Sequence, residues 1–163
     1  LLASSAASDV YKRQGVSLVG EENTRYLFHN PCHTPFAGST PLLTVNQLIT
    51  AGDGTKVELT DRCCGESGTF AVSRPDIANQ VRFRKEEDIR LRKSRLESDG
   101  FSGEVKILTA CPACLQGLSR YNDATQTEAE FLVVEMARLQ YGKNWLPDFL
   151  HDVSKDGIEH VLV

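Results

Sequence analysis

The chain has 163 residues, of which 40% are hydrophobic, and this size and composition suit one globular domain. Its 18 basic and 22 acidic residues give a formal charge of -4, which excludes a general attraction to nucleic acid or to an acidic membrane surface. This charge also leads us to expect no nucleic-acid partner. No apolar run is long enough to span a bilayer, so we expect no transmembrane segment. The five cysteines, an odd number, are typical of metal-binding or redox thiols in a reducing compartment, which predicts a cytoplasmic location.

The first 14 residues, LLASSAASDVYKRQ, differ in character from the rest of the chain. They have a Ser/Ala-rich opening and a basic end, without the apolar core of a cleavable signal. A transit peptide is one interpretation, but the string resembles linker-derived translation at the end of a reading frame. We therefore interpret residues 1–14 as a non-native or disordered leader, and residues 15–163 as a single domain that is a fragment of a larger enzyme.

Three short apolar runs each end at a cysteine, and each is predicted to be a strand that leads into a polar turn. In chain order they are RYLFHNPC up to Cys32, KVELTDRCC up to Cys63 and Cys64, and EVKILTAC up to Cys111. A segment with helical spacing follows each run, over residues 39–52, 73–97 and 112–121. Further along, the pattern predicts a helix over 128–142, a shorter helix over 145–157 and a terminal strand over 158–163.

Strands that alternate with helices indicate an α/β fold, with a parallel sheet built from βαβ units. In such sheets the loops after the strands gather at one edge, where ligands bind. The cysteine loops are expected at this carboxyl-terminal edge of the strands, so cysteines that are distant in sequence would be close in space. Helix N-termini also point to this edge, and their partial positive charge favours thiolates.

Three segments carry a resemblance to a known family: FHNPCH at 28–33, CCGESGTF at 63–70 and CPACLQGLSRY at 111–121. Together they resemble the cysteine-rich CCG domain of heterodisulfide reductase and of the glycolate oxidase iron–sulfur subunit. The segment CPACLQGLSRYND and the tail through GIEHVLV are most similar to the carboxyl-terminal region of large bacterial FAD-linked oxidases of the D-lactate dehydrogenase type. One departure is a longer interval between CCG and CPAC, which falls in the basic segment RFRKEEDIRLRKSRLESDGFSGE.

The resemblance implies a protein-bound iron–sulfur cluster of the 4Fe-4S kind, with a non-cubane form as a variant. The metal ligands that it implies are all five cysteines: Cys32, Cys63, Cys64, Cys111 and Cys114. Two vicinal cysteines suit two irons of one polynuclear cluster better than one tetrahedral ion. Gly65 would let backbone amides approach the sulfurs. His29 and His33 flank Cys32, and either is a candidate ligand, proton carrier or hydrogen-bond donor to a thiolate, with His33 the one we favour. We expect His29 to pack or hydrogen-bond inside the sheet.

The resemblance also implies a function: the domain would relay electrons from FAD to an acceptor in a dehydrogenase for 2-hydroxy acids such as D-lactate or glycolate. The chain lacks a Gly-rich dinucleotide loop. FAD is therefore expected only in upstream domains, and the fragment alone is not expected to be catalytic. The implied partners are flavin and ferredoxin-like domains of the same or an associated polypeptide, and a quinone or another electron acceptor. A peripheral position at the inner membrane is an alternative to a free cytoplasmic one.

Two alternatives remain open on the sequence. Zinc takes four ligands in a tetrahedral array and would make this a structural or docking module. A heterodisulfide or thiol reductase-like site is the other alternative, because CPAC at a helix start resembles a thioredoxin-like CxxC pair. The basic segment after CCG is predicted to be a solvated helix face with i,i+4 ion pairs, or a docking surface for an acidic redox domain.

Overall fold

The computed structural model describes residues 15–34, 40–60, 62–66 and 70–156. Its main sheet has four strands, all parallel, in the order β4-β2-β5-β6. They are β2 (Thr24–His29), β4 (Glu58–Thr60), β5 (Glu104–Thr109) and β6 (Glu128–Phe131). Helices connect the strands, as parallel pairing requires. The predicted α/β class is confirmed.

A helix was expected over 39–52, but the structure divides this segment. Helix α2 (Pro41–Leu48) has Pro41 in its first turn and stops at Ile49, which is extended. Strand β3 (Ile49–Thr50) then pairs in parallel with β1 (Leu18–Val19), forming a separate two-stranded sheet. Because Ile49 and Thr50 are β-branched, they favour this extended pairing over a last helical turn.

The helix expected over 128–142 is wrong in its first four residues, which form β6. Glu128, Ala129 and Glu130 are common in helices, but their backbone pairs with the buried strand β5 from Lys106 to Thr109. Lys106 Nζ also lies 3.3 Å from a carboxylate oxygen of Glu128 across this pair. Helix α7 (Leu132–Tyr141) follows and ends at Gly142, as predicted.

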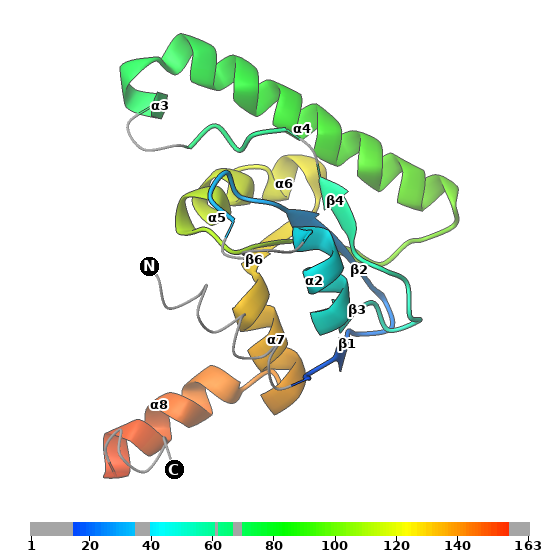
Figure 1. Ribbon diagram of the computed structural model, residues 1–163, viewed down its shortest axis with the longest axis vertical. Coiled ribbons are helices and arrows are strands. Elements are labelled where there is room, and N and C mark those ends of the chain that lie inside the picture. Colours follow the sequence, from blue (N-terminus) through cyan, green and yellow to red (C-terminus); the bar gives the residue numbers. More distant parts are fainter. Residues whose placement is uncertain (1–14, 35–39, 61, 67–69, 157–163) are drawn as a thin grey trace.

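The remaining helices largely agree with the predicted segments. A short helix, α3 (Phe70–Ser73), precedes α4 (Pro75–Ser98), and α5 (Pro112–Ser119) is followed by α6 (Asn122–Thr125). Helix α8 (Trp145–Asp156) continues after α7 and projects away from the sheet (Figure 1). The expected strand over 158–163 and the leader over 1–14 lie outside the described residues.

Helices lie on both faces of the main sheet (Figure 1), and each face has a hydrophobic layer. Side chains on a strand alternate between faces, so Tyr26 and Phe28 pack with α2 and α7, whereas Leu27 packs with α4 and α5. The second layer also contains Cys64 and Cys114. The cysteine site is therefore built into the core beneath α4 and α5.

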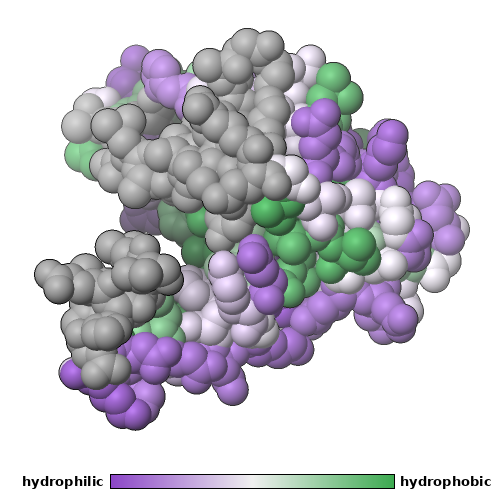
Figure 2. Space-filling model, turned by 60° about the horizontal axis from the view of Figure 1, so that its bottom comes forward, coloured by the Kyte–Doolittle hydropathy of each residue, from purple (hydrophilic) through white to green (hydrophobic). Residues whose placement is uncertain are grey.

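Figure 2 shows a hydrophobic patch bordered by hydrophilic residues, seen from the end of the molecule where α8 lies. The large hydrophobic side chains at the surface include Tyr141, Leu146, Phe149 and Leu150, on α7 and α8. None of the helices in the described part of the chain combines the length and the apolar character needed to cross a membrane.

Candidate metal centre

The strand order creates a crevice at the carboxyl ends of β2 and β5. The chain runs from β2 to its neighbour β4 on one side, and from β5 to its neighbour β6 on the other side, so the two connections leave the neighbouring strands β2 and β5 in opposite directions. A sheet of this order binds ligands at such a switch point, outside the carboxyl ends of the strands. The loop after β2 carries Cys32, the loop after β4 carries Cys63 and Cys64, and β5 leads to Cys111.

Cys64 and Cys114 form the buried part of the site. Their exposed fractions are 3% and 4%, and their Sγ atoms lie 3.3 Å apart. A disulfide would need about 2.05 Å, and both cysteines are free thiols. Two thiolates on one tetrahedral zinc ion lie about 3.8 Å apart. The pair is therefore set at a separation close to that of ligands sharing a metal.

Helix α5 positions the CPAC cysteines. Cys111 is the N-cap residue, extended in conformation, and Pro112 fits the first helical turn because its missing N–H is not needed there. Cys114 lies in the same first turn and is directed into the core against Cys64. Both sulfurs are thus near the positive end of the helix dipole, which favours thiolates.

His29, the last residue of β2, belongs to the same group. It is 3% exposed, and the ligand atoms of His29, Cys64 and Cys114 all lie within 4.8 Å of one another. Within the described part of the chain, its Nδ1 atom is buried without a hydrogen-bond partner. A buried imidazole nitrogen without a partner is unfavourable unless it meets a ligand. We expected His29 to be buried, but not to join the cysteine site.

Cys63 and Cys32 form the exposed part of the site. Burial raises the pKa of the Cys63 thiol, while a 3.4 Å hydrogen bond from the Gly65 amide opposes the rise. Charge repulsion from Cys64 and Cys32, and a hydrogen bond to Cys32, raise this pKa further. Cys63 therefore connects the buried pair to the exposed cysteine after β2.

The buried pair shares its protons unequally. The hydrogen bond with Cys114 lowers the pKa of Cys64, and contacts with His29 and the Glu66 amide lower it further against the effect of burial. The pKa of Cys114 is raised by Cys64, by burial and by its interaction with Cys111. Cys64 is thus the thiolate of the pair, which is the form that binds metal. Pairwise interactions link all five cysteines, in the order Cys32, Cys63, Cys64, Cys114 and Cys111.

The CCG loop is anchored to two helices through Glu66. Its carboxylate lies 2.7 Å from Arg82 on α4 and 3.4 Å from Arg120 at the end of α5. Gly65 has a φ of +76°, which favours glycine, and an added Cβ would lie 3.1 Å from the Arg82 side chain. The Gly65 amide also donates to Cys63 Sγ at 3.4 Å, and its role beside a metal centre stays a prediction.

A buried cation lies beside the site. Lys85 on α4 has no exposed surface, and its Nζ donates to Thr60 Oγ1 at 2.6 Å. Burial lowers the pKa of Lys85 to about 8, although the charges of Asp88 and Cys64 oppose this effect. Lys85 and the Cys64 thiolate therefore attract each other electrostatically.

The structure thus places Cys64 at the centre of the predicted set, in contact with Cys63 and Cys114, and connects Cys32 through Cys63. His33 lies in the exposed loop after β2 and is outside the group of His29, Cys64 and Cys114. A role for His33 stays a prediction. The sequence analysis preferred a packing role for His29, although strand alternation puts His29 on the same face as Leu27, the face that carries the site.

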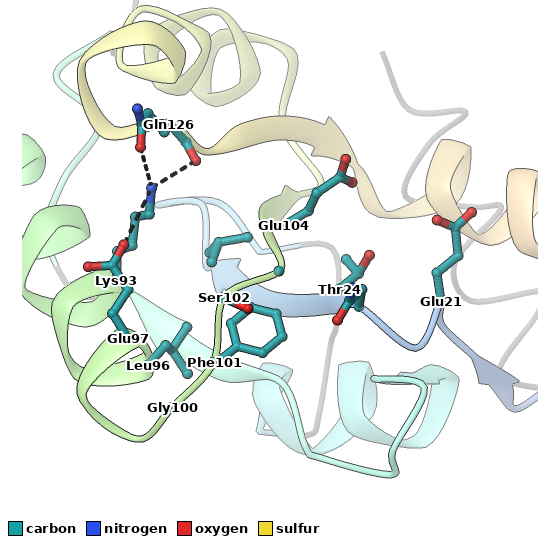
Figure 3. A pocket seen from close by; sticks show the side chains of 13 residues that line it. Glu21, Thr24, Lys93, Leu96, Glu97, Gly100, Phe101, Ser102, Glu104 and Gln126 are labelled. Carbon is teal, nitrogen blue, oxygen red and sulfur yellow. Dashed lines mark hydrogen bonds and ion pairs between the residues drawn. The ribbon is translucent and has the colours of Figure 1, made fainter.

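A large hollow lies at the opposite edge of the sheet, where β2 and β5 begin (Figure 3). Its volume is about 810 Å³, and its lining includes Thr24, Glu104 and Phe101. Lys93 points to Gln126 there and donates to its Oε1 at 3.1 Å. This hollow has no cysteine or histidine in its lining, so it is separate from the candidate metal centre.

Comparison with family models gives two matches. Residues 26–119 match the model of the cysteine-rich domain called CCG, and residues 119–163 match a domain of unknown function, DUF3400. No curated protein and no solved structure matches the chain. The first match spans more than half of the chain and includes all five cysteines. The chain therefore belongs to the CCG family of cysteine-rich domains.

Proposed function

We propose that this domain holds an iron–sulfur cluster and relays electrons within an FAD-linked dehydrogenase for 2-hydroxy acids. The observation that carries the proposal is the continuous set of five free cysteines, from buried Cys64 and Cys114 to exposed Cys63 and Cys32. A cluster with several irons uses more thiolates than one tetrahedral ion, and it would supply one-electron transfer. Vicinal Cys63 and Cys64 suit ligands to neighbouring irons.

The chemistry of the donor set fits such a group. Cysteine thiolates are the usual ligands of iron–sulfur clusters, and the lowered pKa of Cys64 favours the thiolate. The cluster would lie between a hydrophobic layer and the surface, so that its exposed edge at Cys63 can be approached by another redox group. Nearby hydrogen bonds, such as that from the Gly65 amide to Cys63, would tune its potential.

The rest of the assignment rests on the family and on the resemblance of the carboxyl-terminal segments. In the parent enzyme, FAD in another domain would oxidise D-lactate, glycolate or a similar acid. The domain would pass the electrons to a ferredoxin-like domain, a quinone or another acceptor. Free thiols of this kind fit the cytoplasm, free or at the inner face of the membrane.

Anaerobic purification of the 163-residue chain tests the proposal, with iron, zinc and acid-labile sulfide measured together with a visible spectrum. Iron with sulfide, and an absorption band that bleaches with dithionite, is the expected result. Zinc without sulfide would overturn the relay function for this domain.

Zinc is the second candidate, because the tightest group contains a histidine. One imidazole and two thiolates, from His29, Cys64 and Cys114, are three ligands of a common structural zinc site. Cys111 or Cys63 would be the fourth. The domain would then be a structural module that fixes neighbouring domains. A thiol reductase-like site is less favoured, since the CPAC pair faces the core and not a free substrate.

A further inference from the structure

A hollow opens beside Cys63, the exposed cysteine of the CCG pair. Its volume is about 570 Å³, and its lining residues are Arg62, Cys63, Val81 and Arg84. A second hollow, of about 460 Å³, adjoins the same two arginines on the side of Glu87, Asp88 and Leu91. Two arginines from different segments, the CCG loop and α4, therefore border the space next to an exposed cysteine.

Several other cations near this hollow and along α4 are paired with carboxylates. Arg82 is paired with Glu66, Arg90 with Glu86, and Arg92 with Asp88, with distances of 2.7–3.2 Å. Within the described ranges, neither Arg62 nor Arg84 has an ion pair or a side-chain hydrogen bond. The prediction of a face neutralised by i,i+4 pairs thus holds along much of α4 and fails beside Cys63.

The backbone holds one of these arginines in an unusual conformation. Arg62 has a φ of +67°, a backbone conformation that residues other than glycine rarely adopt. It directly precedes Cys63, so the strained residue and the exposed sulfur share one turn. On the opposite wall, Val81 and Arg84 come from the same turn of α4. The hollow therefore combines two arginine side chains with a lining surface that is otherwise largely apolar.

We propose that this hollow binds a small organic molecule through its carboxylate or phosphate group, which Arg62 and Arg84 hold beside Cys63. Guanidinium groups bind both anions through paired hydrogen bonds. A volume of about 570 Å³ lies in the range of small-molecule sites, about 300–1,000 Å³. A concave site with two cations that have no carboxylate partner among the described residues favours a small anion over a flat protein surface. The binding of an anion by the two arginines does not depend on the proposed function. The interpretation that the anion lies next to a metal ligand, Cys63, does rest on it.

Calorimetric titration of the full chain tests the site with two probes, succinate for the carboxylate and inorganic pyrophosphate for the phosphate. Arg62→Gln and Arg84→Gln remove the charges at exposed positions. Arg90→Gln is the matched control, because it removes the same charge from α4 at a residue already paired with Glu86. Metal content is measured on each variant, so that failure of the metal centre and failure of the anion site are seen separately.

The expected result is saturable binding of at least one probe by the unaltered chain and by Arg90→Gln. In Arg62→Gln and Arg84→Gln the affinity should be weaker by about tenfold or more, because each variant loses roughly one charged pair of hydrogen bonds to the anion. The tighter probe identifies the anion. Absence of saturable binding of both probes to the unaltered chain would overturn the proposal and leave the arginines to an acidic protein partner. Equal weakening by Arg90→Gln would also overturn it, because the binding would then be a general effect of charge.

Discussion

The Sγ atoms of Cys64 and Cys114 lie 3.3 Å apart in the hydrophobic layer beneath α4 and α5, although 50 positions separate them in sequence. This contact joins the CCG loop to the CPAC helix. It also sets the centre of the cysteine site inside the core, with Cys63 and Cys32 toward solvent. The metal centre and the hydrophobic packing of this face of the sheet thus share residues, so a substitution that disturbs the packing should also lower metal binding, and the reverse.

Serine replacements at the five cysteines should distinguish cluster from zinc. If a cluster uses all five thiolates, each variant should lose iron and sulfide, with the greatest loss in Cys64→Ser and Cys114→Ser because these residues are buried. Zinc needs four ligands. Retention of a full metal complement in one cysteine variant would therefore contradict the five-cysteine cluster. Metal and sulfide analysis after anaerobic purification measures both quantities.

His29→Leu tests whether the histidine binds the metal or only a thiolate. In the proposed cluster His29 hydrogen-bonds to Cys64, so the variant should keep its iron. Its reduction potential should become more negative, because the thiolate loses a hydrogen bond. Redox titration of the visible spectrum measures the shift. His33→Leu, at an exposed position, is the control and should leave the potential unchanged. Loss of the metal in His29→Leu would instead identify His29 as a ligand.

Lys85 should make the stability of the fold depend on pH in the alkaline range. Burial lowers its pKa from 10.5 to about 8. Between these values the unfolded chain keeps a proton that the folded chain has released, so the free energy of unfolding should rise with pH. The full rise is about 3 kcal/mol, complete near pH 10.5 and absent below pH 8.

Urea unfolding of the metal-free, reduced chain across this pH range measures the effect. Lys85→Met keeps the length of the side chain without its charge and should lose this rise, while the contributions of the thiols remain in both proteins. An identical pH dependence in the variant would show that Lys85 does not carry the buried charge.

Gly65→Ala should disturb the metal centre as well as the fold. At a φ of +76° an added side chain costs about 1–2 kcal/mol, and its Cβ would lie 3.1 Å from the Arg82 side chain that anchors the loop. We expect a lower melting temperature and a lower metal content. Gly100→Ala is the matched control, since Gly100 has a φ of +87° with nothing within 4 Å of an added Cβ. It should lose stability but keep its metal, and an equal loss of metal there would contradict the specific role of Gly65.

Glu135 should contribute strongly to stability on the other face of the sheet. This carboxylate is 1% exposed and accepts a hydrogen bond from Tyr26 at 2.8 Å, with Arg138 and Lys106 as its cationic partners. Glu135→Ala leaves buried positive charge unpaired and should cost about 3–5 kcal/mol in urea unfolding. Glu86→Ala removes a half-buried i,i+4 partner of the exposed Arg90 and should cost about 0.5 kcal/mol or less. Similar costs for the two variants would show that the buried network is not a major source of stability.

The stabilisation by Glu135 should itself depend on pH in the acid range. Burial alone would raise the pKa of Glu135, but hydrogen bonds from Arg138 and Tyr26 and the charge of Lys106 lower it below its usual value. The contribution is therefore complete above the unfolded pKa of about 4.3 and is lost as the pH falls through the folded value. Urea unfolding extended to acid pH measures the effect. In Glu135→Ala the free energy of unfolding should fall less steeply as the pH drops below about 4.3 than it does in the unaltered chain.

The sequence by itself determined the α/β class and the placement of the cysteine loops. The runs at 24–29 and 104–109 are rich in β-branched and aromatic residues, and Pro75 and Pro112 mark the starts of α4 and α5. These signals are local, because they depend on the conformational preferences of neighbouring residues. The CCG and CPAC motifs likewise lie in short stretches that can be recognised without a fold.

Only the tertiary structure decided which segments pair and which face carries the site. Glu128–Phe131 is a strand because β5 offers it backbone partners, and Ile49–Thr50 is extended because Leu18–Val19 lies beside it. His29 joins Cys64 and Cys114 because α4 and α5 cover its face of β2. Arg62 and Arg84 likewise meet beside Cys63 because the CCG loop packs against α4. These relationships join residues that are distant in sequence, so their energies exist only once the chain has folded and no local pattern contains them.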